Sequence, residues 1–86
     1  MNICFTPTGW EDYQYWIAED RKMERKIVML IRDIAREPFK GIGKPEALRN
    51  EFQGWWSRRI DGEHRLVYRL SNETIWINQC RYHYKK

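Results

Sequence analysis

The chain carries GWWSRRIDGEHRLVYRLSNETIWINQC at residues 54–80, and this segment contains most of the predicted sheet. It holds three runs rich in aromatic and branched residues, at 55–60, 64–70 and 74–80, the last of which can extend to 82. Asp61-Gly62 is a strong hairpin-turn signal, and a short polar link joins the second pair of runs. Strands with such short connections must run antiparallel. The segment therefore predicts a three-stranded antiparallel meander.

The N-terminal half predicts one short strand, residues 2–6, and two helices. Thr8 is the predicted start of the first helix, because Glu11 three residues later completes a capping box. A turn or kink at 19–20 leads into the second helix, which Pro38 ends. Apolar residues recur at helical spacing in this second helix: Met23, Ile27, Leu30, Ile31 and Ile34.

Between the helices and the meander, residues 39–45 form a predicted loop with two glycines. Residues 45–49 suit one short helical turn, since proline is favoured at the first helical position. The order strand, helix, helix, meander defines an α+β fold, which we expect to form a single domain over residues 1–86. The helices would cover one face of the sheet and leave the other free to hold a site.

Composition excludes several classes of protein. No segment approaches the roughly 18 consecutive apolar residues of a membrane span. The N-terminus has no basic region followed by an apolar stretch, so no signal peptide is evident and we expect a cytoplasmic protein. Cys4 and Cys80 are interpreted as buried, reduced residues, and no Cys, His or carboxylate spacing suggests a metal. No cofactor is predicted.

The net charge of +4 is distributed unevenly. Residues 1–39 carry six Lys/Arg and seven Asp/Glu, whereas residues 40–86 carry ten Lys/Arg and five Asp/Glu. The two halves therefore have net charges of −1 and +5. A one-sided basic surface favours a polyanionic partner such as RNA or DNA, although many basic domains bind neither.

Three groups of side chains could carry chemistry, and each also has a plain structural interpretation. The tail CRYHYKK, residues 80–86, combines cations, aromatic rings and His83, but a solvated terminus would have the same composition. Arg65 and Arg69 share one face of their strand, where arginines either hold phosphate or pair with nearby acidic residues. Glu46 is either a catalytic carboxylate or a favourable charge at a helix start. His64 is interpreted as structural.

These residue types suit RNA cleavage without a metal. RNA carries its own nucleophile, the 2′-hydroxyl, so an enzyme needs a base, an acid for the leaving 5′-oxygen and a group that stabilises the charge on phosphorus. Glu46, His83 and Arg65 form the minimal set for these three tasks. Such a set also occurs by chance in small proteins.

The chain resembles the YoeB-type toxins of the RelE superfamily, which are ribosome-dependent mRNA interferases of bacterial toxin–antitoxin systems. The resemblance runs almost end to end, in blocks that keep their order and spacing. The most specific blocks are WEDY at 10–13, YW at 15–16, PF at 38–39, GIGKPE at 41–46, WSRRI at 56–60, EHRLVY at 63–68 and CRYHY at 80–84.

The resemblance implies a role for each site residue. Glu46 takes the place of the general base, His83 that of the general acid, Arg65 that of the phosphate clamp, and Tyr84 that of a residue that positions the substrate. Position 49, commonly Lys in the family, is Arg49 here. Cations expected to contact RNA are Lys44, Arg49, Arg58, Arg59, Arg81 and Lys85.

The resemblance also implies a RelE-like fold and a set of partners. These are mRNA in the ribosomal A site, ribosomal RNA, a cognate antitoxin of the YefM/Phd type, operator DNA bound by the toxin–antitoxin complex, and a second copy in a homodimer. The leading hypothesis is therefore an endoribonuclease. The alternatives are a non-catalytic subunit that binds ribosomal RNA or DNA as a co-repressor, and an interaction protein whose aromatic surface binds a partner chain.

Overall fold

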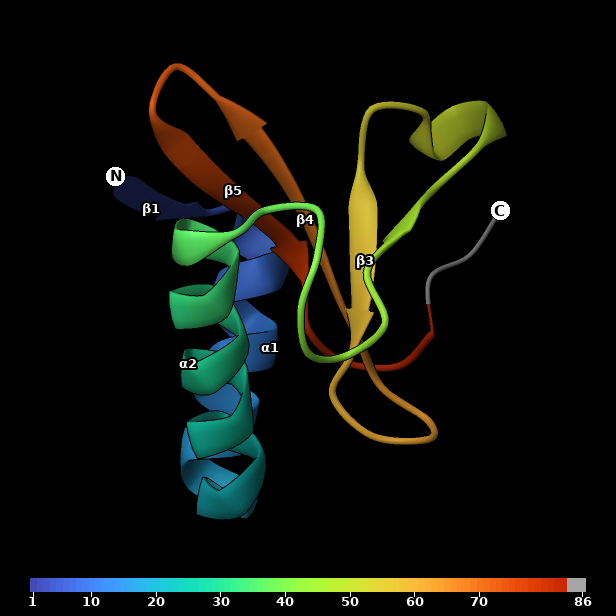
Figure 1. Ribbon diagram of the computed structural model, residues 1–86. Helices are drawn as coiled ribbons and strands as arrows, with labels where there is room; N and C mark the ends of the chain where they lie inside the picture. The colour runs from blue at the N-terminus through green and yellow to red at the C-terminus, as the bar shows by residue number, and fades with distance from the viewer. Residues whose placement is uncertain (84–86) are drawn as a thin grey trace.

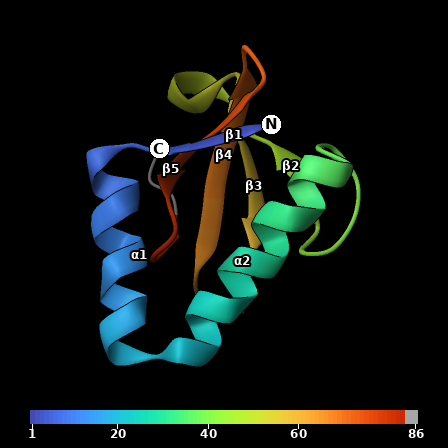
Figure 2. The ribbon, with the colours of Figure 1, turned by 90° about the vertical axis from the view of Figure 1, so that its left-hand side faces the viewer.

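The computed structural model describes residues 1–83 and forms two layers, a pair of helices against a mixed five-stranded sheet (Figure 1). Both helices lie on the same side of the sheet, which Figure 2 shows from the helical side. The strand order is β1-β5-β4-β3-β2. The elements are β1 (Asn2–Phe5), α1 (Pro7–Glu19), α2 (Arg21–Arg36), β2 (Glu46–Ala47), the 3₁₀ turn η1 (Asn50–Phe52), β3 (Trp56–Arg59), β4 (Arg65–Ser71) and β5 (Thr74–Gln79). The predicted α+β class is confirmed.

The central meander of β3, β4 and β5 forms as the sequence predicts, with antiparallel pairing throughout. Asn72 and Glu73 both have a positive φ, 52° and 59°, which is the conformation of a type I′ hairpin turn. In the β3–β4 connection, the Asp61 carboxylate accepts hydrogen bonds from the backbone amides of Glu63 and His64. Residues within the two turns therefore stabilise both hairpin connections.

The two outer strands depart from the predicted pattern. β1 pairs in parallel with β5, so the sheet is mixed and not purely antiparallel. The helical turn predicted at residues 45–49 is wrong, because Glu46 and Ala47 form β2 and pair with Ser57 and Trp56 of β3. An exposed strand edge offers this segment backbone partners that a lone helical turn does not.

The N-cap of the first helix lies two residues before the predicted one. Thr6 is the N-cap, its hydroxyl accepts from the amide of Gly9, and Pro7 occupies the first helical position. The proposed capping box of Thr8 and Glu11 is therefore wrong. The predicted break between the helices is confirmed, because the side chain of Asp20 caps α2 by accepting from the amide of Lys22.

The core lies between the helices and the near face of the sheet. Its fully buried apolar residues come from α2, β4, β5 and the residue that follows β5: Ile27, Ile34, Leu66, Tyr68, Ile75, Ile77 and Cys80. Both cysteines are free; Cys80 is buried, whereas Cys4 is only partly so. None of the helices described for residues 1–83 has the length and apolar character needed to span a membrane.

Candidate active site

The register of the strands assigns side chains to the two faces of the sheet. Leu66 and Tyr68 belong to the core, so their neighbour Val67 points the opposite way, to the face turned away from α1 and α2. We call this the far face. A row of directly opposed residues crosses it on four strands: Glu46, Ser57, Val67 and Gln79. Opposed residues share a face, so Glu46 projects from the far face.

Arg65 lies on the same face as Glu46. It is two residues before Val67 on β4 and is paired with Arg59 of β3. Two strand spacings and two residue rises separate the Cα atoms of Glu46 and Arg65, or about 12 Å in a regular sheet. A phosphate placed between the carboxylate and the long guanidinium side chain can bridge that separation.

The environment of Arg65 favours an anionic ligand. The residue is only 8% exposed, and its Nη1 donates to the carbonyl oxygens of Asp61 and His64, at 3.0 and 3.2 Å. Among residues 1–83, no Asp or Glu carboxylate forms an ion pair with it. A largely buried cation that is hydrogen-bonded on one side and has no counter-ion favours binding of phosphate.

The tail that carries His83 is fastened to the start of β4. The carbonyl oxygen of Tyr82 accepts from the amide of Arg65 at 3.0 Å, and the amide of Tyr82 donates to Nδ1 of His64 at 2.7 Å. Figure 1 shows residues 80–83 passing from the end of β5 to the side of the sheet opposite the helices. His83 follows directly, so the tail brings it to the far face beside Arg65.

His83 lines an open pocket of about 370 Å³ together with residues of α1, η1 and β5. The other lining residues are Thr8, Asp12, Phe52, Gln79, Arg81 and Tyr82. Gln79 belongs to the row that contains Glu46, so Glu46, Arg65 and His83 gather on one side of the molecule. Tyr84 and Lys85 lie outside the described residues.

Four lining residues outside the tail were not predicted from the sequence as site residues: Thr8, Asp12, Phe52 and Gln79. Asp12 fastens α1 to the tail, since its carboxylate accepts from the amide of Cys80 at 3.0 Å. Burial raises the pKa of Asp12, against the lowering effects of that hydrogen bond and of Arg81. Asp12 lies in the WEDY block at 10–13, but nothing in that block marks it as a pocket residue, and no such block contains the other three. Phe52, an aromatic residue within a polar segment, was the one available signal.

Arg58 requires a correction, because it is fully buried and cannot contact RNA in this fold. It faces the helices, where it forms an ion pair with Asp33 and donates to the Tyr68 hydroxyl. It also donates to carbonyl oxygens of the loop after α2, those of Glu37, Pro38, Lys40 and Ile42. These contacts hold the loop that leads to Glu46, so Arg58 is a structural residue.

The other predicted RNA-contacting cations in the described chain are accessible to different degrees. Lys44, Arg49 and Arg59 are exposed. Arg81 is partly covered, with its guanidinium 3.5 Å from the ring centre of Tyr15 and 4.5 Å from that of Tyr82. Its Nε is buried and has no hydrogen-bond partner among residues 1–83. Arg81 therefore stiffens the tail through its two ring contacts.

The structural interpretation of His64 is supported. The imidazole is buried and makes an edge-on contact with Trp16, with ring centres 4.8 Å apart. Because Nδ1 accepts the Tyr82 amide, this nitrogen is unprotonated. His64 therefore fixes the tail just before His83.

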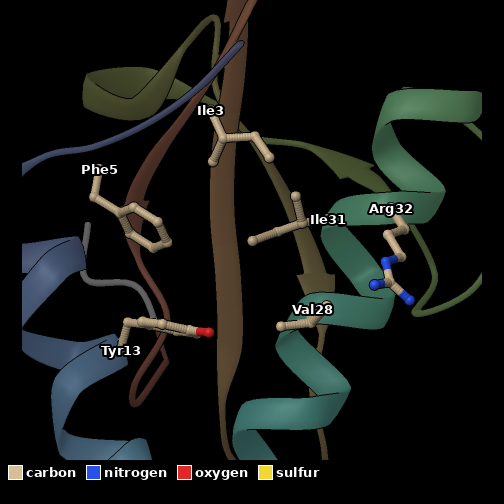
Figure 3. Close-up of a pocket in the computed structure, with 6 residues that line it drawn as sticks. All are labelled: Ile3, Phe5, Tyr13, Val28, Ile31 and Arg32. Atoms are coloured by element: carbon tan, nitrogen blue, oxygen red, sulfur yellow. The ribbon is translucent and has the colours of Figure 1, made fainter. Parts of the chain in front are cut away.

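A separate apolar pocket of about 230 Å³ lies on the helical side of the sheet (Figure 3). Side chains of β1, α1 and α2 surround it: Ile3, Phe5, Tyr13, Val28, Ile31 and Arg32. Because it opens on the side opposite Glu46 and Arg65, it is not part of the candidate site.

The fold and the charged far face define a class of small α+β proteins with a basic site on the side of the sheet opposite the helices. A family described as "YoeB-like toxin of bacterial type II toxin-antitoxin system" matches residues 5–84. The chain therefore belongs to the YoeB-like toxin family.

Individual relatives cover nearly the whole chain. A curated Toxin YoeB of Streptomyces coelicolor is 56% identical over 98% of this chain and 100% of its own length. A YoeB/ParE toxin structure from Agrobacterium tumefaciens is 46% identical, with a TM-score of 0.95 over 98% of this chain and 100% of that one.

The YoeB toxin of Staphylococcus aureus has been solved both as a heterotetrameric complex with YefM and as a dimer. In the complex it is 47% identical to this chain, with a TM-score of 0.91 over 98% of each chain. The predicted RelE-like, YoeB-type fold is thus confirmed, and the chain is a toxin of a type II toxin–antitoxin system.

Proposed function

We propose that the chain is a metal-independent endoribonuclease that cleaves mRNA in the ribosomal A site. The observation that carries this proposal is the buried Arg65, which lacks a carboxylate partner among residues 1–83 and lies between Glu46 and the tail with His83. A site for binding alone would not need a carboxylate on the face that receives phosphate. An acid–base mechanism needs one.

In the proposed reaction, the Glu46 carboxylate takes the proton of the 2′-hydroxyl, whose oxygen attacks the adjacent phosphorus. The guanidinium of Arg65 stabilises the additional negative charge on the phosphoryl oxygens. The bond from phosphorus to the 5′-oxygen breaks, and the His83 imidazolium gives its proton to that oxygen. The products are a 2′,3′-cyclic phosphate and a 5′-hydroxyl. Tyr84 follows His83 and is proposed to position the substrate.

The setting of this reaction is part of the same proposal. The S. aureus relative, solved with YefM and as a dimer, supports a YefM/Phd-type antitoxin and a homodimer for this chain. The exposed Lys44, Arg49 and Arg59 support docking on ribosomal RNA. The toxin would act in the cytoplasm, and its complex with the antitoxin would bind operator DNA.

The test is cleavage of a defined mRNA on ribosomes, with the cut and its end groups mapped. His83→Gln and Glu46→Gln should each lower the rate by about 10²- to 10⁴-fold, because each removes a positioned proton-transfer group. Glu51→Gln is the matched control, since Glu51 is an exposed carboxylate of η1 outside the proposed machinery.

Two further experiments test the metal-independent mechanism and the role of the 2′-hydroxyl. Cleavage should persist when transition metals are removed by a chelator, with Mg²⁺ kept at the level that ribosomes need, and should stop when the scissile nucleotide carries 2′-deoxyribose. Full activity of the His83 variant would remove His83 as the acid. The non-catalytic alternative would instead be favoured if the wild type cleaved no RNA and the Glu46 and His83 variants were as toxic as the wild type.

A further inference from the structure

A second open pocket lies on the far face, toward the end of β4 away from Arg65. It has a volume of about 320 Å³ and is lined by Thr6, Trp55, Arg69, Ser71 and Trp76. This volume falls within the range of small-ligand sites, roughly 300–1,000 Å³. Neither the proposed acid–base set nor the core accounts for two tryptophans and an arginine at this position.

Strand register places this pocket on the same face as the candidate active site. Arg69 and Trp76 are direct cross-strand partners, so both project from one face. Arg69 is four residues after Arg65 on β4, an even spacing that gives the two guanidinium groups the same orientation. The far face therefore continues from Arg65 into the pocket.

The three side chains form a row that suits a nucleotide. The guanidinium of Arg69 lies 5.8 Å from the ring centre of Trp55, and Trp76 is adjacent on β5. Arg69 is exposed and Trp76 is 37% exposed. Within residues 1–83, Arg69 has no ion pair with a carboxylate. Indole rings stack nucleobases, and an unpaired guanidinium binds phosphate.

We propose that this Trp55–Arg69–Trp76 pocket is a subsite for the same single-stranded RNA whose scissile phosphate lies at Arg65, with one base stacked on an indole ring and Arg69 on a neighbouring phosphate. The inference rests on the proposed function. Four residue rises separate Arg65 and Arg69, or about 14 Å. The subsite would therefore hold a nucleotide beyond those that flank the cut and would favour longer substrates.

The experiment measures binding of a short, fully 2′-O-methylated single-stranded RNA, which has no free 2′-hydroxyl to react. Fluorescence anisotropy of a dye on the RNA reports affinity. Trp76→Leu keeps an apolar side chain but removes the stacking ring, and Arg69→Gln removes the charge. Each should weaken binding by about 5- to 150-fold, the effect expected from the loss of one base–aromatic stack or comparable contact.

Matched controls come from the helical layer. Trp10→Leu removes a half-exposed tryptophan of α1, and Arg25→Gln removes an exposed arginine of α2. Both should bind the RNA like the wild type, and thermal unfolding should show that all four variants are folded. Wild-type affinity in both Trp76→Leu and Arg69→Gln would overturn the subsite. If these variants instead change only the sedimentation of the protein, the pocket is a contact between two copies and the proposal fails.

Failure of the subsite and failure of the nuclease proposal give different results. If wild-type protein cleaves mRNA on ribosomes and the two pocket variants bind RNA normally, only the subsite is wrong. If wild-type protein binds the RNA through the pocket but cleaves nothing, only the nuclease proposal is wrong. A cleaving enzyme with the subsite should show a higher KM in Trp76→Leu, with kcat close to the wild-type value.

Discussion

Two arginines on neighbouring strands show how one residue type acquires opposite roles. Arg58 is paired with Leu66 and so faces the helices, where a carboxylate and backbone carbonyl oxygens engage its donors. Arg65 is paired with Arg59 and faces away from the helices, where its charge has no carboxylate partner in the described chain. Strand register therefore separates a structural cation from a candidate phosphate ligand.

The carboxylate that partners Arg58 should make stability depend on acid pH. The pKa of Asp33 is lowered to about 2, first by its hydrogen bond with Arg58 and then by that with Arg36. An unfolded Asp titrates near pH ~3.9, so the unfolded chain takes up a proton before the folded one. The resulting stabilisation is complete above about pH 5 and is lost as the pH falls toward 2.

Urea unfolding at a series of acid pH values measures this effect. Asp33→Asn should be less stable than the wild type near neutral pH, and the difference between the two proteins should shrink on acidification. A difference that stays constant from about pH 5 to pH 2 would contradict this role for Asp33.

At the scale of the elements, the close approach of α1 to β5 explains how the first helix is positioned. A Cβ atom on Gly9 would collide with the backbone carbonyl oxygen of Ile77. The Thr6 hydroxyl donates to the carbonyl oxygen of Asn78, and the carboxylate of Asp12 accepts from the amide of Cys80. These contacts place α1 beside the tail that leads to His83.

Gly9→Ala should therefore destabilise the fold by about 1–3 kcal/mol, the usual cost of overpacking. Gly62→Ala is the matched control, because a Cβ atom there meets open space. Urea denaturation midpoints compare the two variants. If Gly9→Ala were as stable as Gly62→Ala, the packing of α1 on β5 would be looser than the structure indicates.

At the scale of the whole molecule, charge should dominate the affinity for RNA. The basic half of the chain supplies the exposed Lys44, Arg49 and Arg59, and Arg65 and Arg69 lie on the same sheet face as Arg59. Cations that contact phosphate release counterions, so binding of single-stranded RNA weakens as salt rises.

The slope of log affinity against log salt should be about −0.7 for each phosphate that the protein contacts. Anisotropy titrations at several salt concentrations measure it, and Arg69→Gln should have a less steep slope than Arg25→Gln. An affinity that is independent of salt would argue against phosphate recognition and for a surface that binds protein.

Local patterns were sufficient to predict both helices and the meander, although not the N-cap of the first helix. The periodicity from Met23 to Ile34, the helix break at Asp20 and the turn chemistry after Asp61 and Ser71 all act over a few residues. Helix periodicity, helix caps and tight turns depend on side chains that are close in the sequence, so these features can be predicted without coordinates.

Pairing between distant segments could not be predicted in this way. The parallel contact of β1 with β5, the strand at Glu46 and the burial of Arg58 depend on partners remote in the chain. So does the juxtaposition of Arg65 with the backbone of Tyr82, which brings His83 to the far face. The residue types of the candidate site were evident from the sequence, but their common face depends on strand register, which forms only when the whole sheet assembles.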